Sequence, residues 1–240
     1  MKIALLGYGK MGKEIEQAAV QSGHSIVLKI NSQNLSLLNA HELKAVDVAI
    51  EFSNPNAVIK NITTCFDAHI PVVVGTTGWY DKMDEMKKMC EKKNGSMLFA
   101  SNFSIGVNLF FELNAFLARL MKDNSVYQPA ITETHHIHKL DKPSGTAITL
   151  ANQIILNHPR LKSWSLQGEE NKLKINALRE GDVTGKHSIS YTSYIDKIEI
   201  THEAFNRKGF AQGAVISAQW LKGRKGFYEM KDILKELFNL

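Results

Sequence analysis

The chain has little cysteine and no long apolar run. Its 240 residues include only two cysteines, Cys65 and Cys90, which stand far apart in segments with a helical pattern. We therefore expect two reduced thiols, as in a cytosolic protein, and no disulfide framework. No apolar stretch approaches the ~20 residues that a membrane span needs, and no basic leader with an apolar run and a cleavage site opens the chain. These absences predict a cytoplasmic protein without a membrane partner.

Blocks of charge of one sign are also missing. The 29 Lys and Arg residues exceed the 24 Asp and Glu residues by enough for a net charge of +5, and they are spread along the sequence. Nucleic-acid binding calls for a basic stripe with interleaved aromatic residues, so we expect no nucleic-acid partner. A mild positive charge is compatible with small anionic ligands. The length can hold one large domain or two modest ones.

The first motif is K-I-A-L-L-G-Y-G-K-M-G-K-E-I, at residues 2–15. An apolar run over residues 2–6 predicts a buried parallel strand, and an amphipathic helix follows to about residue 21. Between them Gly7, Gly9 and Gly12 spell G-x-G-x-x-G. In a dinucleotide fold the first glycine permits a tight turn, the second lets the backbone approach the pyrophosphate, and the third lets helix and strand pack closely. This context predicts a nucleotide-binding turn, with free helix N–H groups for phosphate.

The next strand, about residues 25–30, should end at the ribose of the nucleotide. Enzymes that select NAD usually carry an acid there, but this chain has Asn31. No Arg is present to hold the 2′-phosphate of NADP, and Lys29 is the nearby cation. These residues do not decide between NAD and NADP as the cofactor. We expect NADH and NADPH to be used with comparable efficiency.

Strands and helices alternate through the rest of the first half. Strands are predicted over residues 46–53 and 96–100, and residues 70–78 predict a buried strand that runs into a Gly-rich turn. Helices end near Cys65 and span about 81–93. Each strand finishes in small polar residues, which could be an ordinary strand-to-helix turn in any single case. Because the carboxyl ends of parallel strands share one edge of a sheet, together they favour one cofactor groove on a doubly wound α/β sheet.

After Val107 the pattern changes to a second, α+β arrangement. A densely apolar helix comes first, and a strand with a turn, a helix over 146–157 and a β-rich segment over 163–204 follow. Helices near 211–221 and 230–237 close the chain. The apolar residues that we place at core spacing in the first helix are Phe110, Leu113, Phe116, Leu117 and Leu120.

The stretch E-T-H-H-I-H-K-L-D-K-P-S-G-T-A, residues 133–147, has the most proton-handling groups. Glu133 and Asp141 could join the histidines as metal ligands, but the spacing matches no zinc pattern and Lys139 would repel a cation, so we expect no metal. On an extended segment His136 and His138 share a face, whereas His135 and His138 do not.

An anion site fits the same stretch better than a metal site. Lys139 and His136 could meet one carboxylate of a ligand, while Ser144, Gly145 and Thr146 offer donors at a helix start. Ser144 would also serve as an ordinary N-cap. His135 alone would be an ordinary satisfied imidazole, but beside Lys139 it is a candidate acid or base.

In this order the motifs resemble the 4-hydroxy-tetrahydrodipicolinate (dihydrodipicolinate) reductase family of the lysine and diaminopimelate pathway. The stretch at 133–147 is the most specific of them, and together they span residues 7–214. The matching pieces are G-Y-G-K-M-G, E-F-S-N-P, V-G-T-T-G, A-S-N-F-S-I-G-V-N, the 133–147 stretch, R-E-G-D-V-T-G-K-H and T-H-E-A-F-N-R-K-G-F-A-Q-G-A.

The resemblance implies NAD(P)H-dependent reduction of a cyclic dicarboxylate with a C=N group. It makes His135 and Lys139 catalytic, and His136, Ser144, Gly145 and Thr146 substrate-binding. It implies a dinucleotide domain of residues 1–104 and 209–240, an inserted substrate domain of residues 105–208, and a homotetramer. The cofactor-binding positions are Gly7, Tyr8, Gly9, Lys10, Met11, Gly12, Asn31, Phe52, Ser53, Gly75, Thr76, Thr77, Ala100, Ser101, Asn102 and Phe103.

Two departures and two alternatives accompany this interpretation. Ile137 stands where many members have Arg; because strand neighbours point to opposite faces, we expect Ile137 to face inward. Asn31 replaces the usual acid and puts cofactor preference in doubt, not the reaction.

Two alternative functions remain. One is another Rossmann-type dehydrogenase of amino-acid metabolism, which would need a nucleophilic cysteine or a different His/carboxylate pair. The other is a non-catalytic NAD(P)-sensing module.

Overall fold

The computed structural model describes residues 1–239 and divides the chain into two compact units. The first unit contains Met1–Ile105 and the residues from Lys208 onward, and the second contains Gly106–Arg207. The chain therefore leaves the first unit once, builds the second and returns. The boundaries lie one residue from those predicted. None of the described helices is long and apolar enough to cross a membrane.

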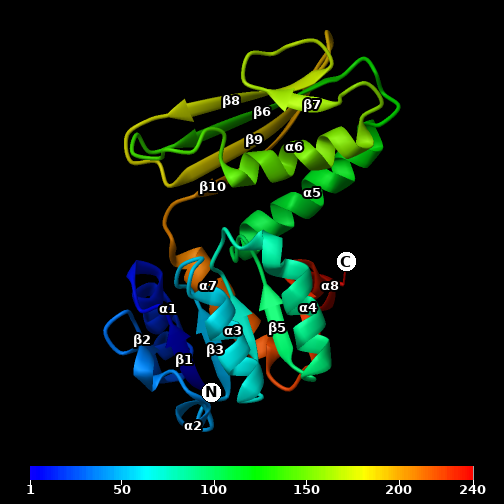
Figure 1. Cartoon of the computed structure of the whole chain (residues 1–240). Helices are drawn as coiled ribbons and strands as arrows, with labels where there is room; N and C mark the ends of the chain where they lie inside the picture. Colours follow the sequence, from blue (N-terminus) through cyan, green and yellow to red (C-terminus); the bar gives the residue numbers. More distant parts are fainter. Residues whose placement is uncertain (240) are drawn as a thin grey trace. The chain divides into compact units, whose positions relative to one another are not determined.

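The first unit is built on a six-stranded parallel sheet with the order β11-β5-β4-β3-β1-β2 (Figure 1). Buried apolar runs form its central strands, since strands covered on both faces expose no side to water. The predicted Rossmann-type α/β fold is confirmed. The strands are β1 (Lys2–Leu6), β2 (Ser25–Ile30), β3 (Val48–Glu51), β4 (Val72–Val74), β5 (Ser96–Phe99) and β11 (Gly226–Glu229).

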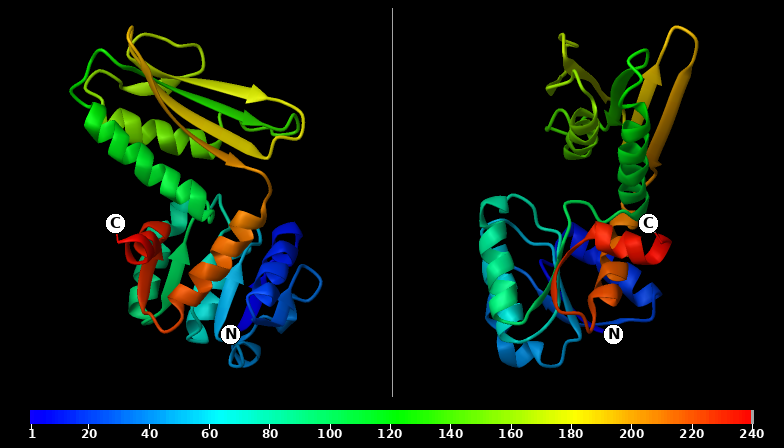
Figure 2. Two further views of the ribbon diagram at one scale, coloured as in Figure 1. Left: turned by 180° about the vertical axis from the view of Figure 1, so that it is seen from behind. Right: turned by 90° about the vertical axis from the view of Figure 1, so that its right-hand side faces the viewer.

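Helices cover both faces of this sheet (Figure 2). One core lies between the sheet and the helices α1 (Lys10–Gln21), α7 (Lys208–Leu221) and α8 (Met230–Phe238). The other lies between the sheet and α2 (Ala40–Leu43), α3 (Val58–Asp67) and α4 (Met83–Lys92). Short 3₁₀ turns, η1 (Leu35–Leu37) and η2 (Tyr80–Lys82), complete the loops. Cys65 and Cys90 are free, buried and helical, as predicted.

The sequence prediction missed one short helix and one strand, and it made another strand too long. The strand predicted over 46–53 is only Val48–Glu51, because Phe52 and Ser53 already belong to the turn. Helix α2 is a single turn, too short to show a period. β11 has four half-buried residues, G-F-Y-E, whose only mark of a strand is its parallel pairing with β5.

The second unit holds a mixed sheet with the order β10-β9-β6-β8-β7. β6 pairs antiparallel with β9 and parallel with β8. Two helices, α5 (Ile105–Met121) and α6 (Gly145–Asn157), pack on the same side of this sheet (Figures 1 and 2). The strands are β6 (Gln128–His135), β7 (Ser163–Ser165), β8 (Lys172–Arg179), β9 (Gly185–Thr192) and β10 (Lys197–Ala204).

The face of α5 that is buried differs from the predicted one. Leu113, Phe116 and Leu120 are 56%, 54% and 63% exposed, so placing them in the core was wrong. This helix is apolar around most of its circumference, and spacing alone therefore selects no face. Contacts with α6 decide which face of α5 is buried. One of them is the hydrogen bond that Asn114 Nδ2 donates to the carbonyl of Leu150 at 3.1 Å. The residues buried along α5 are Val107, Phe110, Asn114 and Ala118.

Candidate functional site

The glycine turn of the first unit has the form that a dinucleotide needs. Gly7 has φ +101°, and a Cβ on it would lie 2.1 Å from the carbonyl oxygen of Phe52. A Cβ on Gly12 would lie 2.6 Å from the carbonyl oxygen of Gly7, so this residue permits the close approach of α1. No protein atom lies within 4 Å of a Cβ built on Gly9. The backbone is open there to a pyrophosphate.

The start of α1 is available to phosphate. Gly9 is the N-cap and contributes no side-chain cap, so no capping side chain occupies the N–H groups of the first turn. Lys10 is exposed beside it, whereas Met11 packs against the core of this face. The residues present therefore fit a dinucleotide at the position that the sequence predicts.

The ends of β3, β4 and β5 bring the other predicted cofactor residues together. Ser53 N donates to Thr76 Oγ1 at 2.8 Å, which ties the β3 turn to the β4 turn. The Phe52 ring lies against Gly75, where a Cβ would come within 2.2 Å of it, and 5.5 Å from the Phe103 ring. Among the remaining positions Ala100 is buried, Thr77 and Ser101 are exposed, and Asn102 Oδ1 accepts from Ser104 N.

Glu51 was missed by the sequence analysis, although it directly precedes two predicted contacts. It is fully buried at the end of β3 and accepts hydrogen bonds from Ser53 Oγ and, at 3.0 Å, from Asn61 Nδ2. Burial raises the pKa of this carboxyl, against the hydrogen bonds of Ser53, Thr76 and Asn61. An acid inside an otherwise apolar strand, V-A-I-E, was the available signal.

At the end of β2, Asn31 holds its own loop. Its Oδ1 accepts from Gln33 N at 2.8 Å, and its backbone N–H donates to Asn34 Oδ1 at 2.7 Å. The loop is closed by Asn34 Nδ2, which donates to the Lys29 carbonyl at 2.8 Å. Asn31 therefore shapes the loop at the ribose end and contributes no charge.

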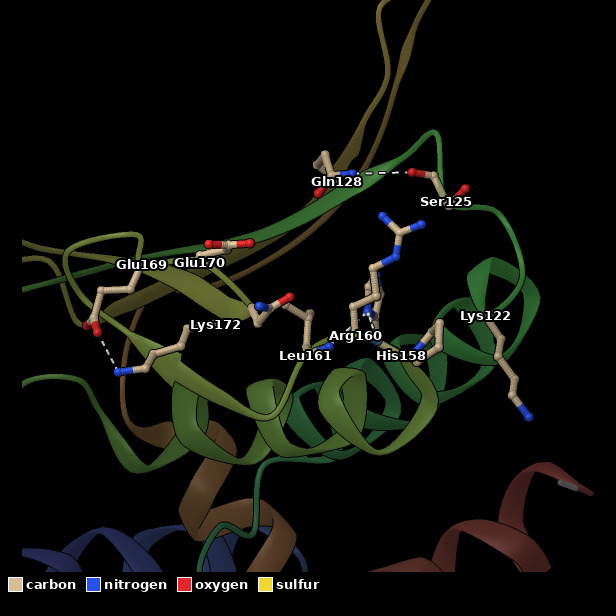
Figure 3. A pocket seen from close by; sticks show the side chains of 11 residues that line it. Lys122, Ser125, Gln128, His158, Arg160, Leu161, Glu169, Glu170 and Lys172 are labelled. Carbon is tan, nitrogen blue, oxygen red and sulfur yellow. Dashed lines mark hydrogen bonds and ion pairs between the residues drawn. The ribbon is translucent and has the colours of Figure 1, made fainter.

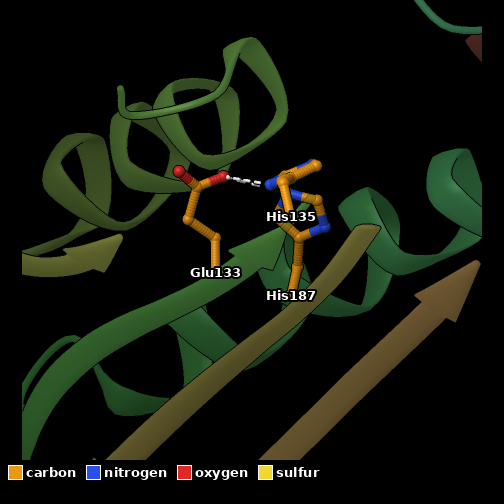
Figure 4. A group of neighbouring side chains, drawn as sticks. All are labelled: Glu133, His135 and His187. Atoms are coloured by element: carbon orange, nitrogen blue, oxygen red, sulfur yellow. Dashed lines mark ion pairs between the residues drawn. The ribbon is translucent and has the colours of Figure 1, made fainter. Parts of the chain in front are cut away.

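In the second unit a carboxylate and two imidazoles meet in a buried cluster (Figure 4). Glu133 and His135 lie near the end of β6, and His187 lies on the adjacent strand β9. His135 Nδ1 is 2.9 Å from Glu133 Oε2, and His187 Nε2 is 3.7 Å from the same oxygen. Glu133 is thus a common partner of both rings.

Arg179, the last residue of β8, joins this cluster to the loop that follows β6. Its guanidinium donates to Glu133 Oε1 at 3.3 Å and to the carbonyls of Lys139 and Asp141 at 3.3 and 2.5 Å. Arg179 therefore holds the backbone on either side of Leu140. Arg179 opens the motif R-E-G-D-V, and no local pattern in the sequence indicates this role.

Burial and hydrogen bonds act in opposite directions on the charges of this cluster. Burial would raise the pKa of Glu133, but hydrogen bonds from His135 and Ser144 outweigh it and lower the pKa to about 2. Burial, and then the nearby charge of His135, lowers the pKa of His187 to about 4. At neutral pH the carboxyl is therefore ionised and the His187 ring is neutral.

The segment after His135 leaves the sheet, which changes the predicted directions of its side chains. β6 ends at His135, and a turn follows in which Lys139 N donates to the His136 carbonyl at 3.1 Å. Ile137 is 60% exposed, so the inward orientation expected from strand alternation was wrong. The rings of His136 and His138 do lie near one another, 6.3 Å apart. Lys139 Nζ is 2.8 Å from Asp141 Oδ1 at the surface.

The start of α6 lies beside the buried cluster. Ser144 is the N-cap: its Oγ accepts from Ala147 N at 3.2 Å and lies 3.1 Å from His187 Nε2. Ser144 N donates to Glu133 Oε1 at 3.1 Å. No protein atom lies within 4 Å of a Cβ built on Gly145, the first residue of the helix, and Thr146 is half-buried. The predicted capping role of Ser144 is confirmed, and the backbone at Gly145 is open to a ligand.

Glu133, His135 and His187 have the composition of a metal site, with candidate ligand atoms within 4.8 Å of one another. The positive charge that a metal ion would supply to Glu133 is supplied there by Arg179. Arg179 thus contacts one oxygen of the carboxylate, and the two imidazole rings lie at the other.

A hollow of about 340 Å³ elsewhere in the second unit has a different character (Figure 3). The loop after α6 and the β7–β8 connection line it. Among its charged groups, Lys172 Nζ and Glu169 Oε2 form an ion pair at 2.5 Å. The predicted site residues are not among those that line it.

A parallel sheet with a glycine-rich nucleotide turn, joined to a mixed-sheet unit that carries histidine and lysine donors, defines a two-domain oxidoreductase of the nicotinamide-nucleotide class. The family model "Dihydrodipicolinate reductase, N-terminus" matches residues 1–103, and "Dihydrodipicolinate reductase, C-terminus" matches residues 106–234. The chain belongs to the dihydrodipicolinate reductase family.

Relatives extend this finding over the whole chain. A 4-hydroxy-tetrahydrodipicolinate reductase of Christiangramia forsetii is 50% identical over 99% of both chains. One of Neisseria gonorrhoeae is 33% identical over 91% of this chain and 83% of its own. A dihydrodipicolinate reductase of Paenisporosarcina, solved with dipicolinate bound, has the same fold, with a TM-score of 0.81 and 22% identity over 98% and 99% of the two chains.

Proposed function

We propose that this chain reduces 4-hydroxy-tetrahydrodipicolinate to tetrahydrodipicolinate with NADH or NADPH, in the cytoplasmic route to diaminopimelate and lysine. The observation that carries the proposal is the arrangement around Glu133 in the second unit. There a histidine is oriented by a buried carboxylate, and the loop that bears Lys139 is held by Arg179. The 50% identical relative bears the name of this activity.

The second unit offers donors for a dicarboxylate. Lys139 and His136 lie on the loop after β6, and the N–H groups of Gly145 and Thr146 lie at the start of α6. Charge-assisted hydrogen bonds of this kind are roughly twice as strong as neutral ones. The dipicolinate bound to the Paenisporosarcina reductase is a dicarboxylate of the expected size. We assign these four residues to substrate binding.

A nicotinamide nucleotide, when bound, would supply the hydride, and the positions predicted above would hold it in the first unit. The 4-hydroxyl group leaves as water, which gives a C=C bond conjugated to the C=N bond. After hydride adds to the far carbon of that system, the neighbouring carbon requires a proton. His135 and Lys139 are the donors that we assign to this step. A proton on Nδ1 of His135 faces Glu133, which leaves Nε2 for exchange with the substrate.

Steady-state kinetics of three variants test these roles. Lys139→Ala should lower kcat by about 10² to 10⁴, the usual cost of losing a positioned acid. His135→Ala should also lower kcat, because it removes the second donor that we assign to the proton transfer. His136→Ala, which removes a ligand of the bound carboxylate, should mainly raise KM. Loss of NADPH absorbance with substrate generated in place provides the readout.

Lys142→Ala is the matched control, because Lys142 is exposed on the same loop and has no assigned role. None of the site variants should weaken the binding of NADH to the free protein, which isothermal titration measures. If His136→Ala and Lys139→Ala share a pure KM defect, Lys139 only anchors the substrate and the proton has another source. If the parent chain oxidises neither nucleotide with this substrate, the proposed reaction is wrong.

We further propose a homotetramer joined through the mixed sheet. Both helices of the second unit cover one face of this sheet, and the other face carries rows of hydroxyl side chains. Ser188 Oγ and Thr201 Oγ1 lie 2.8 Å apart on it, next to half-buried Thr132. Small side chains of this kind allow a second sheet to approach closely.

Sedimentation of a Ser188→Arg variant tests the tetramer. A long charged side chain at the centre of the open face should convert the tetramer to smaller species. Ser125→Arg, in the exposed loop before β6, is the control and should leave the assembly intact. A parent chain that is monomeric at micromolar concentration contradicts the proposal.

A further inference from the structure

The ribose end of the nucleotide groove carries an ion pair. Lys29, the residue before the last of β2, places its Nζ 2.6 Å from Glu16 Oε1 of helix α1. The Tyr8 hydroxyl donates to Glu16 Oε2. Lys29 Nζ also lies 4.9 Å from the centre of the Tyr8 ring. Both oxygens of the carboxylate are therefore engaged, and three segments meet in one contact.

These three segments are the ones that surround the adenosine ribose in a dinucleotide fold. Tyr8 belongs to the glycine turn, Glu16 to the helix that follows, and Lys29 to the strand whose end meets the ribose. The position that usually carries the selecting acid is Asn31, which is engaged in its own loop. Charge near the ribose thus comes from β2 and α1 and not from the residue after β2.

Both members of the pair are charged at neutral pH. Hydrogen bonds from Lys29 and then Tyr8 lower the pKa of Glu16, and the hydrogen bond to Glu16 raises the pKa of Lys29. Their side chains are 24% and 42% exposed, so either can meet a ligand without unfolding of its surroundings. A 2′-phosphate would have to draw Lys29 away from Glu16 and would be repelled by that carboxylate. A 2′-hydroxyl meets neither obstacle.

We propose that the Glu16–Lys29 pair sets the preference of this chain between NADH and NADPH. Lys29 is the cation that can hold a 2′-phosphate, and Glu16 restrains it and opposes the phosphate charge. This inference rests on the proposed function and specifies how its cofactor is chosen. Because Glu16 offsets the attraction of Lys29 for a 2′-phosphate, NADPH gains little over NADH from this pair.

Two single variants and their combination separate the two members. Glu16→Gln keeps the size of the side chain but frees Lys29, so NADPH should bind roughly 5- to 20-fold more tightly, as expected for one charge-assisted contact. Lys29→Met leaves the Glu16 charge uncompensated, and NADPH should bind more weakly by a similar factor. The affinity for NADH should change by a smaller factor in both. The double variant should return the ratio of the two affinities toward that of the parent chain.

Glu14→Gln is the matched control, because it makes the same change of net charge on the same helix. Glu14 is half-buried, and Lys29 pairs with Glu16 instead. Fluorescence titration of the full chain with NADH and with NADPH, without substrate, measures all affinities, and kcat/KM for each nucleotide gives a second readout. Retained NADH binding shows that each variant is folded.

The outcomes distinguish this inference from the proposed function. A rise in the NADPH/NADH affinity ratio in Glu16→Gln but not in Glu14→Gln, with a fall in Lys29→Met, supports the ion pair as the selecting element. Equal shifts in Glu16→Gln and Glu14→Gln, or none, overturn it while the reductase activity of the parent chain stands. A parent chain that binds neither nucleotide overturns both.

Discussion

Two glutamates, one in each unit, are fully buried next to a predicted site, and their pKa values shift in opposite directions. Glu51 at the end of β3 is contacted by the neutral side chains of Ser53 and Asn61, and burial raises its pKa. Glu133 in β6 faces Arg179, His135 and the amide of Ser144, and its pKa falls to about 2. Both side chains are fully buried, so their partners decide the direction in which the pKa shifts.

The difference assigns different tasks to the same residue type. Glu51 connects the turn after β3 to helix α3, because its carboxyl accepts hydrogen bonds from Ser53 and from Asn61. Glu133 is the negative centre of a cationic cluster, and its charge holds Arg179 and thereby the loop that bears Lys139. Replacing each by glutamine, which keeps the shape and removes the charge, tests the comparison directly.

The largest effect is expected for Glu133→Gln. Removing this charge leaves the guanidinium of Arg179, largely buried, without its anion. Breaking a buried ion pair in this way typically costs about 3–5 kcal/mol of unfolding free energy. The variant should also lose kcat, since His135 loses its partner. Urea unfolding followed by circular dichroism measures the first effect. An unchanged midpoint would mean that Glu133 is protonated in the native protein.

The next effect is a dependence of stability on pH that arises from His187. Its pKa falls from the ordinary 6.5 to about 4 in the folded chain. Between these values the unfolded chain binds a proton that the native chain does not, so stability is full above about 6.5 and is lost as the pH falls toward 4. At about 1.4 kcal/mol per pKa unit, roughly 3 kcal/mol depends on this group.

His187→Gln should remove most of that slope, because glutamine keeps a polar group near Ser144 but does not titrate. Urea unfolding at intervals from pH 4 to 8 measures it. His202→Gln is the control: burial lowers the pKa of His202 as well, but this ring is only half-buried, and the change in slope should be smaller. Equal slopes in the parent chain and His187→Gln would show that the proton is taken up elsewhere.

The smallest effect is expected for Glu51→Gln, at about 1 kcal/mol or less at neutral pH, since its hydrogen-bond partners are neutral. Because the folded pKa is raised, the stability that Glu51 contributes is present below the ordinary pKa of 4.5 and is lost as the pH rises through the folded value. The unfolding free energy of Glu51→Gln should therefore rise relative to that of the parent chain as the pH rises. That of Glu133→Gln should fall relative to the parent chain over the same change. A loss of several kcal/mol would place an unrecognised cation beside Glu51.

The sequence by itself determined the elements with a clear local signature. Apolar runs mark β1, β3 and β4, the G-x-G-x-x-G spacing marks the nucleotide turn, and Ser144 marks the start of α6, because strand burial, turn geometry and helix capping depend on neighbours in the chain. The same local reasoning located the stretch of His135 and Lys139.

Only the tertiary structure decided which distant groups meet. Arg179 reaches Glu133 across parallel strands, Glu16 meets Lys29 between a helix and a strand, and β11 is a strand because β5 lies beside it. Ile137 is exposed because β6 ends at His135, whereas the predicted inward orientation required the strand to continue to residue 137. Charge and hydrogen bonding act through space, and a single sequence records the identity of each group but not the separation between them. The opposite pKa shifts of Glu51 and Glu133 therefore follow from the partners that folding gives them.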